Sequence, residues 1–426
     1  MKRAFTASLF FVTSTTFAQF TSSLQFAYTH DSNVFGSFAD IPDNYLTVNL
    51  SLDNYTGWDY SDLDLSYNGA LASYNSYPEQ DNWVHNVDAT YRIQLSRVGD
   101  NMGNGDDSTS ESGGSLLVPV DSLETYLTLA GAIAKTVPHS GDFSAYQNYI
   151  ASGNANLRYP FGQTSVLRVA YGINYTEYDY ISSLSNLENI GFANLSFYPS
   201  QNVVFYLDGS YGNKKYYGVD TVSTSVKNLI KMHSNGSYKG KGKGNGGTPP
   251  PSSSVKTYVL NSPFATQATY GGGLILRFGQ WKANGSLLLR KDVSGNARYI
   301  NAVAKFSSRV SAIYDDPYSY QGNEINLGVR KDSLLSGINV SVGLDRANKD
   351  YNRPAFDYTQ TKVIAKQRHD ICTDISIALS KEYSIKGVAS GLTLGLNYDH
   401  IDNSSNDEFY NFTDDVITLS LGINLF

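Results

Sequence analysis

A histidine and a serine stand two residues apart in the segment YTHDSNVF at residues 28–35. Side chains two apart on an extended strand lie on the same face, so the imidazole of His30 could activate the hydroxyl of Ser32. Asn44 opens the next expected strand in the corresponding phase and could orient that imidazole. This arrangement predicts hydrolytic chemistry at one sheet edge. The Asp-Ser-Asn run also favours a turn, so a strand end followed by a turn explains the same residues.

Other kinds of chemistry have little support in the sequence. The six histidines form no dense group with cysteine or carboxylates at zinc-ligand spacing, so we expect no metal and no cofactor. Cys372 is the single cysteine, which excludes a disulfide within the chain. The net charge of -7 argues against nucleic acid as a partner.

The elements that would position these residues show in the last twelve residues, DVITLSLGINLF. Apolar and polar side chains alternate there, which is the pattern of a strand with one apolar and one polar face. The same alternation recurs in 166–175, 338–345 and 392–399. It predicts an all-β chain in which long two-faced strands follow one another.

We expect about eighteen antiparallel strands in an up-and-down transmembrane barrel, with sixteen as the alternative and the twelfth and thirteenth strands the weakest. The expected starts lie near 22, 43, 61, 82, 122, 145, 164, 188, 201, 264, 281, 296, 308, 320, 337, 367, 390 and 413. An even count that closes the barrel places both termini in the periplasm. A secreted β-sandwich or β-helix is the soluble alternative.

The N-terminal segment is typical of a secretory signal peptide. Lys2 and Arg3 precede a moderately apolar core, and Thr16-Phe17-Ala18 has the small-x-small pattern of a cleavage site. Removal of residues 1–18 leaves a barrel at 19–426. Mean hydropathy is -0.30, but only alternate residues of a barrel meet lipid, so the mean conceals a membrane surface.

The closing segment resembles the C-terminal signature of Gram-negative outer-membrane β-barrel proteins, porin-like proteins among them. That signature has an aromatic last residue and alternating apolar positions. Here the apolar set includes Leu425 and is displaced by one from Phe426. The resemblance implies an outer-membrane location, contact with membrane lipid and insertion by the outer-membrane assembly machinery. By analogy with porins, it also implies a homo-oligomer.

The H-x-S-N sequence with a later Asn resembles outer-membrane phospholipase A, and H-x-S resembles the lipid A deacylases. The resemblance implies Ser32 as nucleophile, His30 as base and Asn44 as orienting residue, with Asp40 or Asp43 as a calcium ligand. Val34 stands where that family has glycine, and this chain is much longer than those small barrels. The segment DSNVF also resembles the first-strand turn of non-enzymatic barrels. An enzyme is therefore the lesser expectation.

The polar face of each strand would line the lumen, and a barrel of sixteen to eighteen strands leaves an aqueous interior. The expected pore-lining charges are Arg158, Arg168, Arg277, Lys282, Arg290, Lys305, Arg309, Arg330, Asp53, Asp64, Asp88, Asp345, Asp370, Asp374 and Asp399. The bases come from middle strands and the acids from the first and last, so the two signs would face each other across the lumen. Simple solvation and pairing of these charges is the alternative.

Two connections are long. Residues 99–115 fall on the expected periplasmic side, against the usual rule of short periplasmic turns. The insertion at about 214–263 should be extracellular, and its lysine-, glycine- and proline-rich centre at 239–254 predicts a flexible segment.

The leading expectation is a porin-like outer-membrane channel for passive passage of small hydrophilic solutes. A lipid esterase using Ser32, His30 and Asn44 is one alternative. A structural or export barrel that docks a protein partner is the other.

Overall fold

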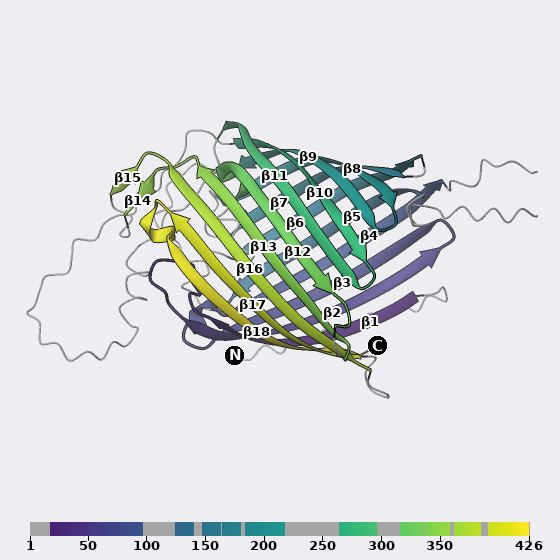
Figure 1. Cartoon of the computed structure of the whole chain (residues 1–426), viewed down its shortest axis with the longest axis horizontal. Coiled ribbons are helices and arrows are strands. Elements are labelled where there is room, and N and C mark those ends of the chain that lie inside the picture. Colours follow the sequence, from purple (N-terminus) through teal and green to yellow (C-terminus); the bar gives the residue numbers. More distant parts are fainter. Residues whose placement is uncertain are drawn as a thin grey trace, which may run out of the picture.

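The protein is described by a computed structural model, in which sixteen antiparallel strands form a closed barrel (Figure 1). The structure describes residues 18–96, 124–139, 147–162, 164–179, 184–217, 264–295, 316–334, 336–357, 362–384 and 391–425. Every strand pairs with the next one along the barrel, and β1 pairs with β18 to close it. The prediction of an all-β antiparallel barrel is confirmed.

The barrel strands are long enough to cross a bilayer, since a tilted membrane strand needs about 9–11 residues. They have from 12 residues in β12 to 16 in β2 and β16. Their bounds are β1 Ala18–Asp31, β2 Asp43–Trp58, β3 Ser61–Tyr74, β4 Asn82–Ser96, β5 Thr125–Pro138, β6 Asn148–Phe161, β7 Ser165–Tyr178, β8 Asn186–Ser200, β9 Val203–Tyr216, β10 Phe264–Phe278, β11 Trp281–Gly295, β12 Tyr320–Lys331, β13 Ile338–Tyr351, β16 Arg368–Tyr383, β17 Gly391–Ser405 and β18 Phe412–Asn424.

Smaller elements lie in the connections. A short hairpin of β14 (Ala355–Phe356) and β15 (Val363–Ala365) lies between β13 and β16. Three 3-10 turns occur in the described residues: η1 (Pro78–Gln80), η5 (Pro317–Ser319) and η6 (Glu408–Tyr410). Over the described ranges, helices with the length and apolar character needed to cross a membrane do not occur.

The expected count of eighteen strands is wrong, and the alternative of sixteen is confirmed. β11 pairs directly with β12, for example Lys282 with Arg330, so the barrel closes without the twelfth and thirteenth expected strands. Those two expected strands begin near 296 and 308, and residues 296–315 lie outside the described part. Alternation shows that a segment would be two-faced if extended, but pairing decides whether it enters the sheet.

The two ends of the barrel differ in their connections. At the terminal end, where β1 begins and β18 finishes, β10 and β11 are joined by two residues, and Gly279 there has a φ of 58°. A two-residue hairpin loop requires such a left-handed residue. At the opposite end, here called the loop end, the connections between β1 and β2 and between β13 and β16 are much longer. The expected alternation of short turns and long loops is confirmed for these strands.

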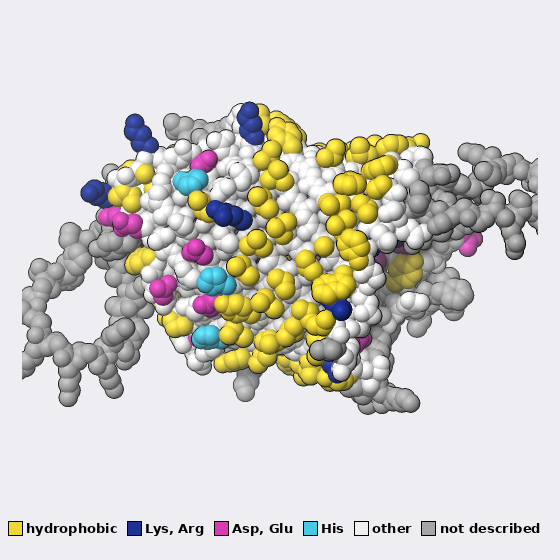
Figure 2. Space-filling view, viewed as in Figure 1, with side chains coloured by type: hydrophobic (Ala, Val, Ile, Leu, Met, Phe, Trp, Pro, Cys, Tyr) yellow, Lys and Arg dark blue, Asp and Glu magenta, His cyan; other side chains and the backbone are white. Residues whose placement is uncertain are grey.

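A belt of apolar side chains crosses the face of the barrel that Figure 2 shows. Large apolar residues on alternate positions are exposed there, for example Leu419 in β18, Leu396 in β17 and Leu207 in β9. Histidines and acids gather on the loop-end side of this belt in the same view. An exposed apolar belt of this kind is stable when it is covered by hydrocarbon.

Three sequence predictions fall on residues outside the described part. Residues 1–17 contain nearly all of the expected signal peptide, and 97–123 contain the segment 99–115. The long insertion runs from the end of β9 to the start of β10, of which residues 218–263 are not described. These three stay predictions.

Candidate functional site

The inner face of the barrel strands carries charged side chains, many of them among the residues that the sequence predicts to line a pore. Thirteen of the fifteen lie on described strands, each at a position alternate to the outward apolar residues of its strand. Lys305 and Arg309 lie outside the described residues. We define the basic arc as Arg158, Arg168, Arg277, Lys282, Arg290 and Arg330, on β6 to β12. We define the acidic arc as Asp53, Asp64, Asp88, Asp345, Asp374 and Asp399, on β13 to β18 and β2 to β4.

The basic arc concentrates cations near the terminal end. Lys282 is the register partner of Arg277 on one side and of Arg330 on the other, so three adjacent strands present three cations in a row. Arg158 and Arg168 are likewise direct partners. Like charges placed directly opposite repel each other. Such rows are stable only when water or anions screen them, so this part of the inner wall requires a wet surface.

The basic arc is partly neutralised at two points. Arg290 Nε donates to Glu324 Oε1 at 2.7 Å, and Arg330 Nε donates to Asp332 Oδ1 at 2.6 Å. The Arg330 side chain is still 57% exposed. The two pairs offset part of the charge of Arg290 and of Arg330, and the row of Arg277, Lys282 and Arg330 keeps a net positive charge.

The acidic arc has its own pair of like charges. Asp345 of β13 and Asp374 of β16 are register partners. The Asp345 carboxylate accepts from the Asn326 amide, and Asp88 accepts from Ser66 Oγ and from the Asn86 amide. Amide and hydroxyl donors satisfy these carboxylates without cancelling their charge. The residues of the two arcs carry opposite signs, but Asp208 and Glu324 also lie on strands of the basic arc and Arg92 lies on a strand of the acidic arc.

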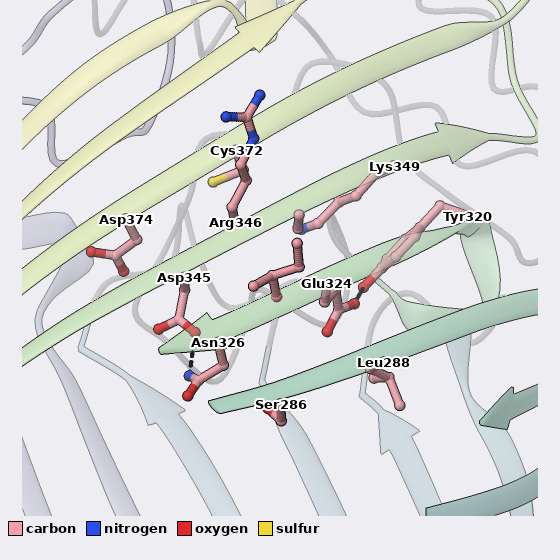
Figure 3. A pocket seen from close by; sticks show the side chains of 12 residues that line it. Ser286, Leu288, Tyr320, Glu324, Asn326, Asp345, Arg346, Lys349, Cys372 and Asp374 are labelled. Atoms are coloured by element: carbon pink, nitrogen blue, oxygen red, sulfur yellow. Dashed lines mark hydrogen bonds between the residues drawn. The ribbon is translucent and has the colours of Figure 1, made fainter. Parts of the chain in front are cut away.

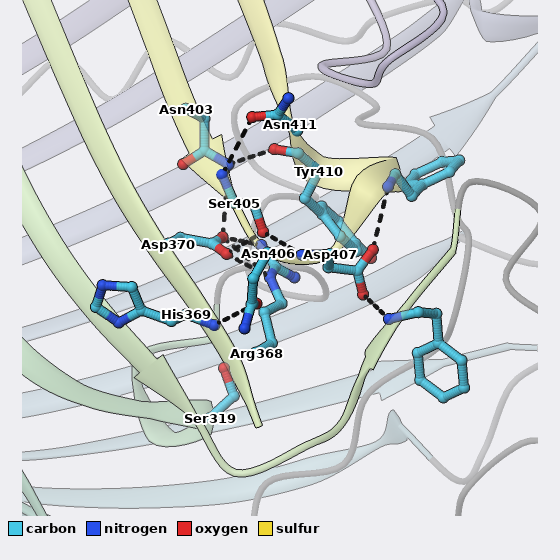
Figure 4. A network of polar contacts seen from close by, with 12 residues as sticks. Ser319, Arg368, His369, Asp370, Asn403, Ser405, Asn406, Asp407, Tyr410 and Asn411 are labelled. Carbon is cyan, nitrogen blue, oxygen red and sulfur yellow. Dashed lines mark hydrogen bonds and ion pairs between the residues drawn. The ribbon is translucent and has the colours of Figure 1, made fainter. Parts of the chain in front are cut away.

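Asp370 differs from its predicted role, because it is buried rather than pore-lining. It is 1% exposed, and the Arg368 guanidinium binds it through Nε at 2.8 and 3.0 Å and through Nη2 (Figure 4). Ser405 Oγ donates to the same carboxylate at 2.5 Å. The Arg368 guanidinium is held between the rings of Tyr351 and Tyr410, at 4.1 and 3.6 Å from their centroids. Asp370 thus holds loop-end structure together.

A second buried carboxylate ties three loop-end connections together. Asp407 accepts from the backbone N–H of Phe356 in β14 at 3.1 Å and from that of Phe409 at 3.2 Å. The Phe409 carbonyl accepts from the Phe38 N–H at 3.1 Å, and the two rings meet edge to face at 5.8 Å. The connections β1–β2, β13–β16 and β17–β18 therefore pack as one unit, which we call the loop-end lock. It comprises Phe38, Tyr351, Phe356, Arg368, Asp370, Ser405, Asp407, Phe409 and Tyr410.

Across the barrel, the segment before β12 folds against the inner wall of β9. Asp316 accepts from Lys214 Nζ at 2.6 Å and from Tyr216 Oη at 3.0 Å. Tyr318 packs so closely on Gly212 that a Cβ there would lie 2.0 Å from its hydroxyl. Burial, with the carboxylate of Glu188 nearby, raises the pKa of Tyr318, so its hydroxyl stays protonated. Two ordered segments thus line the loop-end mouth.

The proposed hydrolytic triad is only half assembled. His30 Nδ1 lies 2.9 Å from Asn44 Oδ1, on an exposed part of the surface, as an orienting asparagine requires. Ser32 lies past the end of β1 and faces β18, where its Oγ donates to Asp414 Oδ1 at 3.1 Å. The same oxygen accepts from the Asp415 N–H at 2.7 Å. These bonds join Ser32 to β18 at the barrel seam, where β1 pairs with β18, and not to the imidazole of His30.

The predicted calcium ligands are also committed to other contacts. Asp43 is 2% exposed and accepts from the Ser76 N–H at 3.0 Å. Asp40 accepts from the Asn33 amide at 3.3 Å. Within the described residues, groups of three or more His, Cys, Asp or Glu arranged to hold a metal ion are absent.

Sequence reasoning missed the members of the loop-end lock other than Asp370. Arg368 and Asp370 are two residues apart on the same face of β16, and the strand pattern does not indicate that loops cover them. The dipeptide Phe409-Tyr410 in a polar loop was the available signal, since aromatic residues in a loop often anchor it by packing.

A family model described as surface lipoprotein assembly modifier matches residues 282–424, from β11 to the end of β18. The search of curated proteins found no match. The chain is similar to solved structures of Pseudomonas aeruginosa OpdL, of a BenF-like porin from Pseudomonas fluorescens Pf-5 and of Acinetobacter baumannii OccAB1. Identities are 13%, 10% and 10%, and TM-scores are 0.43, 0.47 and 0.45. The matches cover 96% of this chain in each case and 98%, 99% and 97% of those chains.

The closed barrel and its exposed apolar belt decide the location. The chain is an outer-membrane β-barrel protein of a Gram-negative bacterium. The belt meets membrane lipid, and the charged arcs lie on the other face of the same strands.

Proposed function

We propose that the protein is a channel for passive passage of small hydrophilic solutes, with the terminal end in the periplasm. The row of Arg277, Lys282 and Arg330 carries this proposal, because three neighbouring cations need water or anions beside them. The acidic arc on the opposite wall gives a field across the lumen, in which polar solutes are oriented as they pass.

The ordered segments at the loop end support a channel that is narrowed there and wider elsewhere. The loop-end lock holds three connections on one side of the mouth, and η5 covers the inner wall of β9 on the other. Both are held by buried ion pairs, Arg368 with Asp370 and Lys214 with Asp316. A constriction built from fixed segments selects solutes by size and charge without a conformational change.

Single-channel recording tests this function. The purified full chain, added to a planar lipid bilayer in KCl, should give stepwise conductance. Neutral sugars of increasing size should enter proteoliposomes at falling rates in swelling assays. A matched preparation of the Arg368→Ala variant should show altered or noisier steps if the loop-end lock shapes the mouth. Silence of the wild-type chain in both assays, with correct insertion shown by protease protection, would contradict the proposal.

A second candidate function follows from the match of residues 282–424 to the family of surface lipoprotein assembly modifiers. The barrel would then dock a lipoprotein or its carrier instead of conducting solutes. Stoichiometric co-purification of a lipoprotein with the barrel, together with loss of that lipoprotein from the cell surface when the barrel gene is deleted, would favour this function. A chain that conducts and co-purifies alone would exclude it.

A further inference from the structure

Two lysines on the outer face of the barrel lie at the terminal-end border of the apolar belt. Lys331 is the last residue of β12 and Lys381 lies near the end of β16, with β13 between the two strands. Both face outward, because they alternate with the exposed apolar residues Val329 and Leu379 of their own strands. Among the described strand residues, the outward positions of the terminal half hold no further Lys or Arg and no Asp or Glu. The outer face at this end is therefore positively charged.

Each of the two ammonium groups is held over an aromatic ring of the same face. Lys331 Nζ lies 4.8 Å from the centroid of the Trp281 ring, and Trp281 is its register partner on β11. Lys381 Nζ lies 4.8 Å from the centroid of the Tyr383 ring on the same strand. A ring face attracts a cation, but it does not supply the oxygen acceptors that the three N–H groups of an ammonium need. The rings therefore position the two charges without satisfying them.

The acids next to the two lysines in the sequence do not neutralise them. Asp332 and Glu382 follow the lysines directly, so their side chains point toward the other side of the sheet. Asp332 Oδ1 accepts from Arg330 Nε at 2.6 Å. In the part of the chain that the structure describes, Lys331 and Lys381 have no carboxylate at ion-pair distance.

The other acids of β12, β13 and β16 lie toward the inner face or the loop end. Glu324, Asp345 and Asp374 line a hollow in the inner wall (Figure 3). Asp350 and Asp370 belong to the loop-end parts of β13 and β16. A phosphate beside the two lysines would therefore meet no competing carboxylate from these strands.

The depth of Lys381 matches one border of a hydrocarbon layer. Three exposed apolar residues, Ile375, Ile377 and Leu379, lie between it and the outward-facing His369 at the loop end. At about 3.3 Å per residue and a tilt of about 40°, the strand from His369 to Lys381 spans about 30 Å along the membrane normal. That length is close to the thickness of the hydrocarbon core, about 30 Å. Lys381 and the tyrosine beside it thus lie at the level of lipid headgroups, where aromatic side chains also gather.

We propose that this patch, here called the lysine pair (Lys331 and Lys381 with Trp281 and Tyr383), binds anionic phospholipids, one phosphate at each lysine. The phosphodiester oxygens accept from the ammonium groups, and the acyl chains continue onto the apolar belt that already meets lipid. A zwitterionic headgroup carries its own ammonium beside the phosphate, so it gains less from a lysine than an anionic headgroup does. The site rests on the proposed placement of the terminal end in the periplasm, because the phospholipid leaflet of an outer membrane faces that side.

Lipid retention measured by native mass spectrometry tests the site. The full chain is released by mild detergent from vesicles of equimolar phosphatidylglycerol and phosphatidylethanolamine. The wild type should retain up to two phosphatidylglycerol molecules, with an enrichment over phosphatidylethanolamine of about fivefold for each lysine. The enrichment should fall when the vesicles are prepared in molar salt, because charges at an exposed site are screened.

Variants assign the retained lipid to the lysine pair. Lys331→Gln with Lys381→Gln should abolish the enrichment, and each single variant should lose one bound phosphatidylglycerol. Lys331→Arg with Lys381→Arg keeps both charges and should keep the enrichment. Arg277→Gln with Lys282→Gln is the matched control, because it removes two charges at the same end but from the inner face, and it should leave retention unchanged.

The outcomes distinguish this site from the channel. Enrichment in a chain that does not conduct would support the site and contradict the channel. Equal retention of both phospholipids by a wild-type chain that conducts would overturn the site and leave the channel standing, and so would equal loss in the inner-face control. In vesicles that also contain lipid A, a preference for lipid A that disappears in the double glutamine variant would overturn both the site and the periplasmic placement of the terminal end.

Discussion

Arg368 at the loop end and Arg330 at the terminal end differ in how far their side chains are buried, and this difference gives them different roles. The Arg368 side chain is 4% exposed and bound to Asp370 between two tyrosine rings. The Arg330 side chain is 57% exposed and stands beside Lys282 in a row of cations. Both sit on the inner face of their strands. The loops that cover Arg368 make it part of the scaffold, whereas Arg330 stays exposed to solvent even though it pairs with Asp332.

Removing the buried arginine should have the largest effect. Arg368→Ala leaves Asp370 as a buried charge without its partner and should lower the free energy of unfolding by about 3–5 kcal/mol. The control Arg330→Ala should change it by less than about 1 kcal/mol. Urea-gradient unfolding in detergent, followed by tryptophan fluorescence, measures both. The double variant Arg368→Ala with Asp370→Ala should recover part of the loss, and equal losses for Arg368→Ala and Arg330→Ala would contradict the comparison.

The next prediction compares the same substitution on the outer and the inner face of one strand. Leu396 of β17 is 38% exposed on the outer belt, and Asn397 follows it on the inner face. Leu396→Arg should cost about 2–4 kcal/mol, because it places a charge in the hydrocarbon region. Asn397→Arg should cost little, since the inner face is wet and acidic nearby. Unfolding in lipid vesicles gives both values, and a larger cost at Asn397 would mean that the faces have been assigned the wrong way round.

A smaller loss of unfolding free energy is expected for contacts at the barrel seam, where β1 pairs with β18. Ser32→Ala removes the bonds from Ser32 to Asp414 and from the Asp415 N–H to Ser32, and should cost about 1 kcal/mol. His30→Ala, which loses only the exposed contact with Asn44, is the matched control and should cost less. A radiolabelled phospholipid assay with wild type and both variants should show no acyl release. Acyl release that depends on Ser32 would establish esterase activity and would contradict a purely structural role for Ser32.

Replacing charged residues on the inner face should have the smallest energetic effect, which is a change in the ion selectivity of the channel. Replacing Arg277, Lys282 and Arg330 together by glutamine should shift the channel toward cations, with the permeability ratio changing about two- to fivefold, because exposed charges are screened. Replacing Asp53, Asp64 and Asp88 by asparagine should shift it toward anions. Reversal potentials across a KCl gradient give the sign of each shift. Shifts of the same sign would contradict the opposed arcs.

The strands were predictable because their signal is local. Expected starts at 43, 61, 82, 264 and 281 coincide with the first residues of β2, β3, β4, β10 and β11. The two surplus strands at 296 and 308 arose from the same alternation, which carries no information on pairing partners. The faces of the charged residues followed from the strand period once the apolar face was assigned to lipid.

The loop-end lock could not be predicted from alternation. Its contacts join residues far apart in the chain, such as Phe38 with Phe409 and Phe356 with Asp407. Asp370 has the same phase and type as Asp374, and only the covering loops give the two carboxylates different roles.

The accessibility of the inner face to water most directly tests whether this barrel is water-filled and set in lipid. In a Cys372→Ser background, Asn397→Cys and Leu396→Cys place one thiol on each side of β17. A membrane-impermeant, water-soluble maleimide applied to intact outer membranes should label the chain with Asn397→Cys rapidly and the chain with Leu396→Cys hardly at all. Rapid labelling at Leu396→Cys with protection at Asn397→Cys, or protection at both positions, would contradict a water-filled barrel set in lipid.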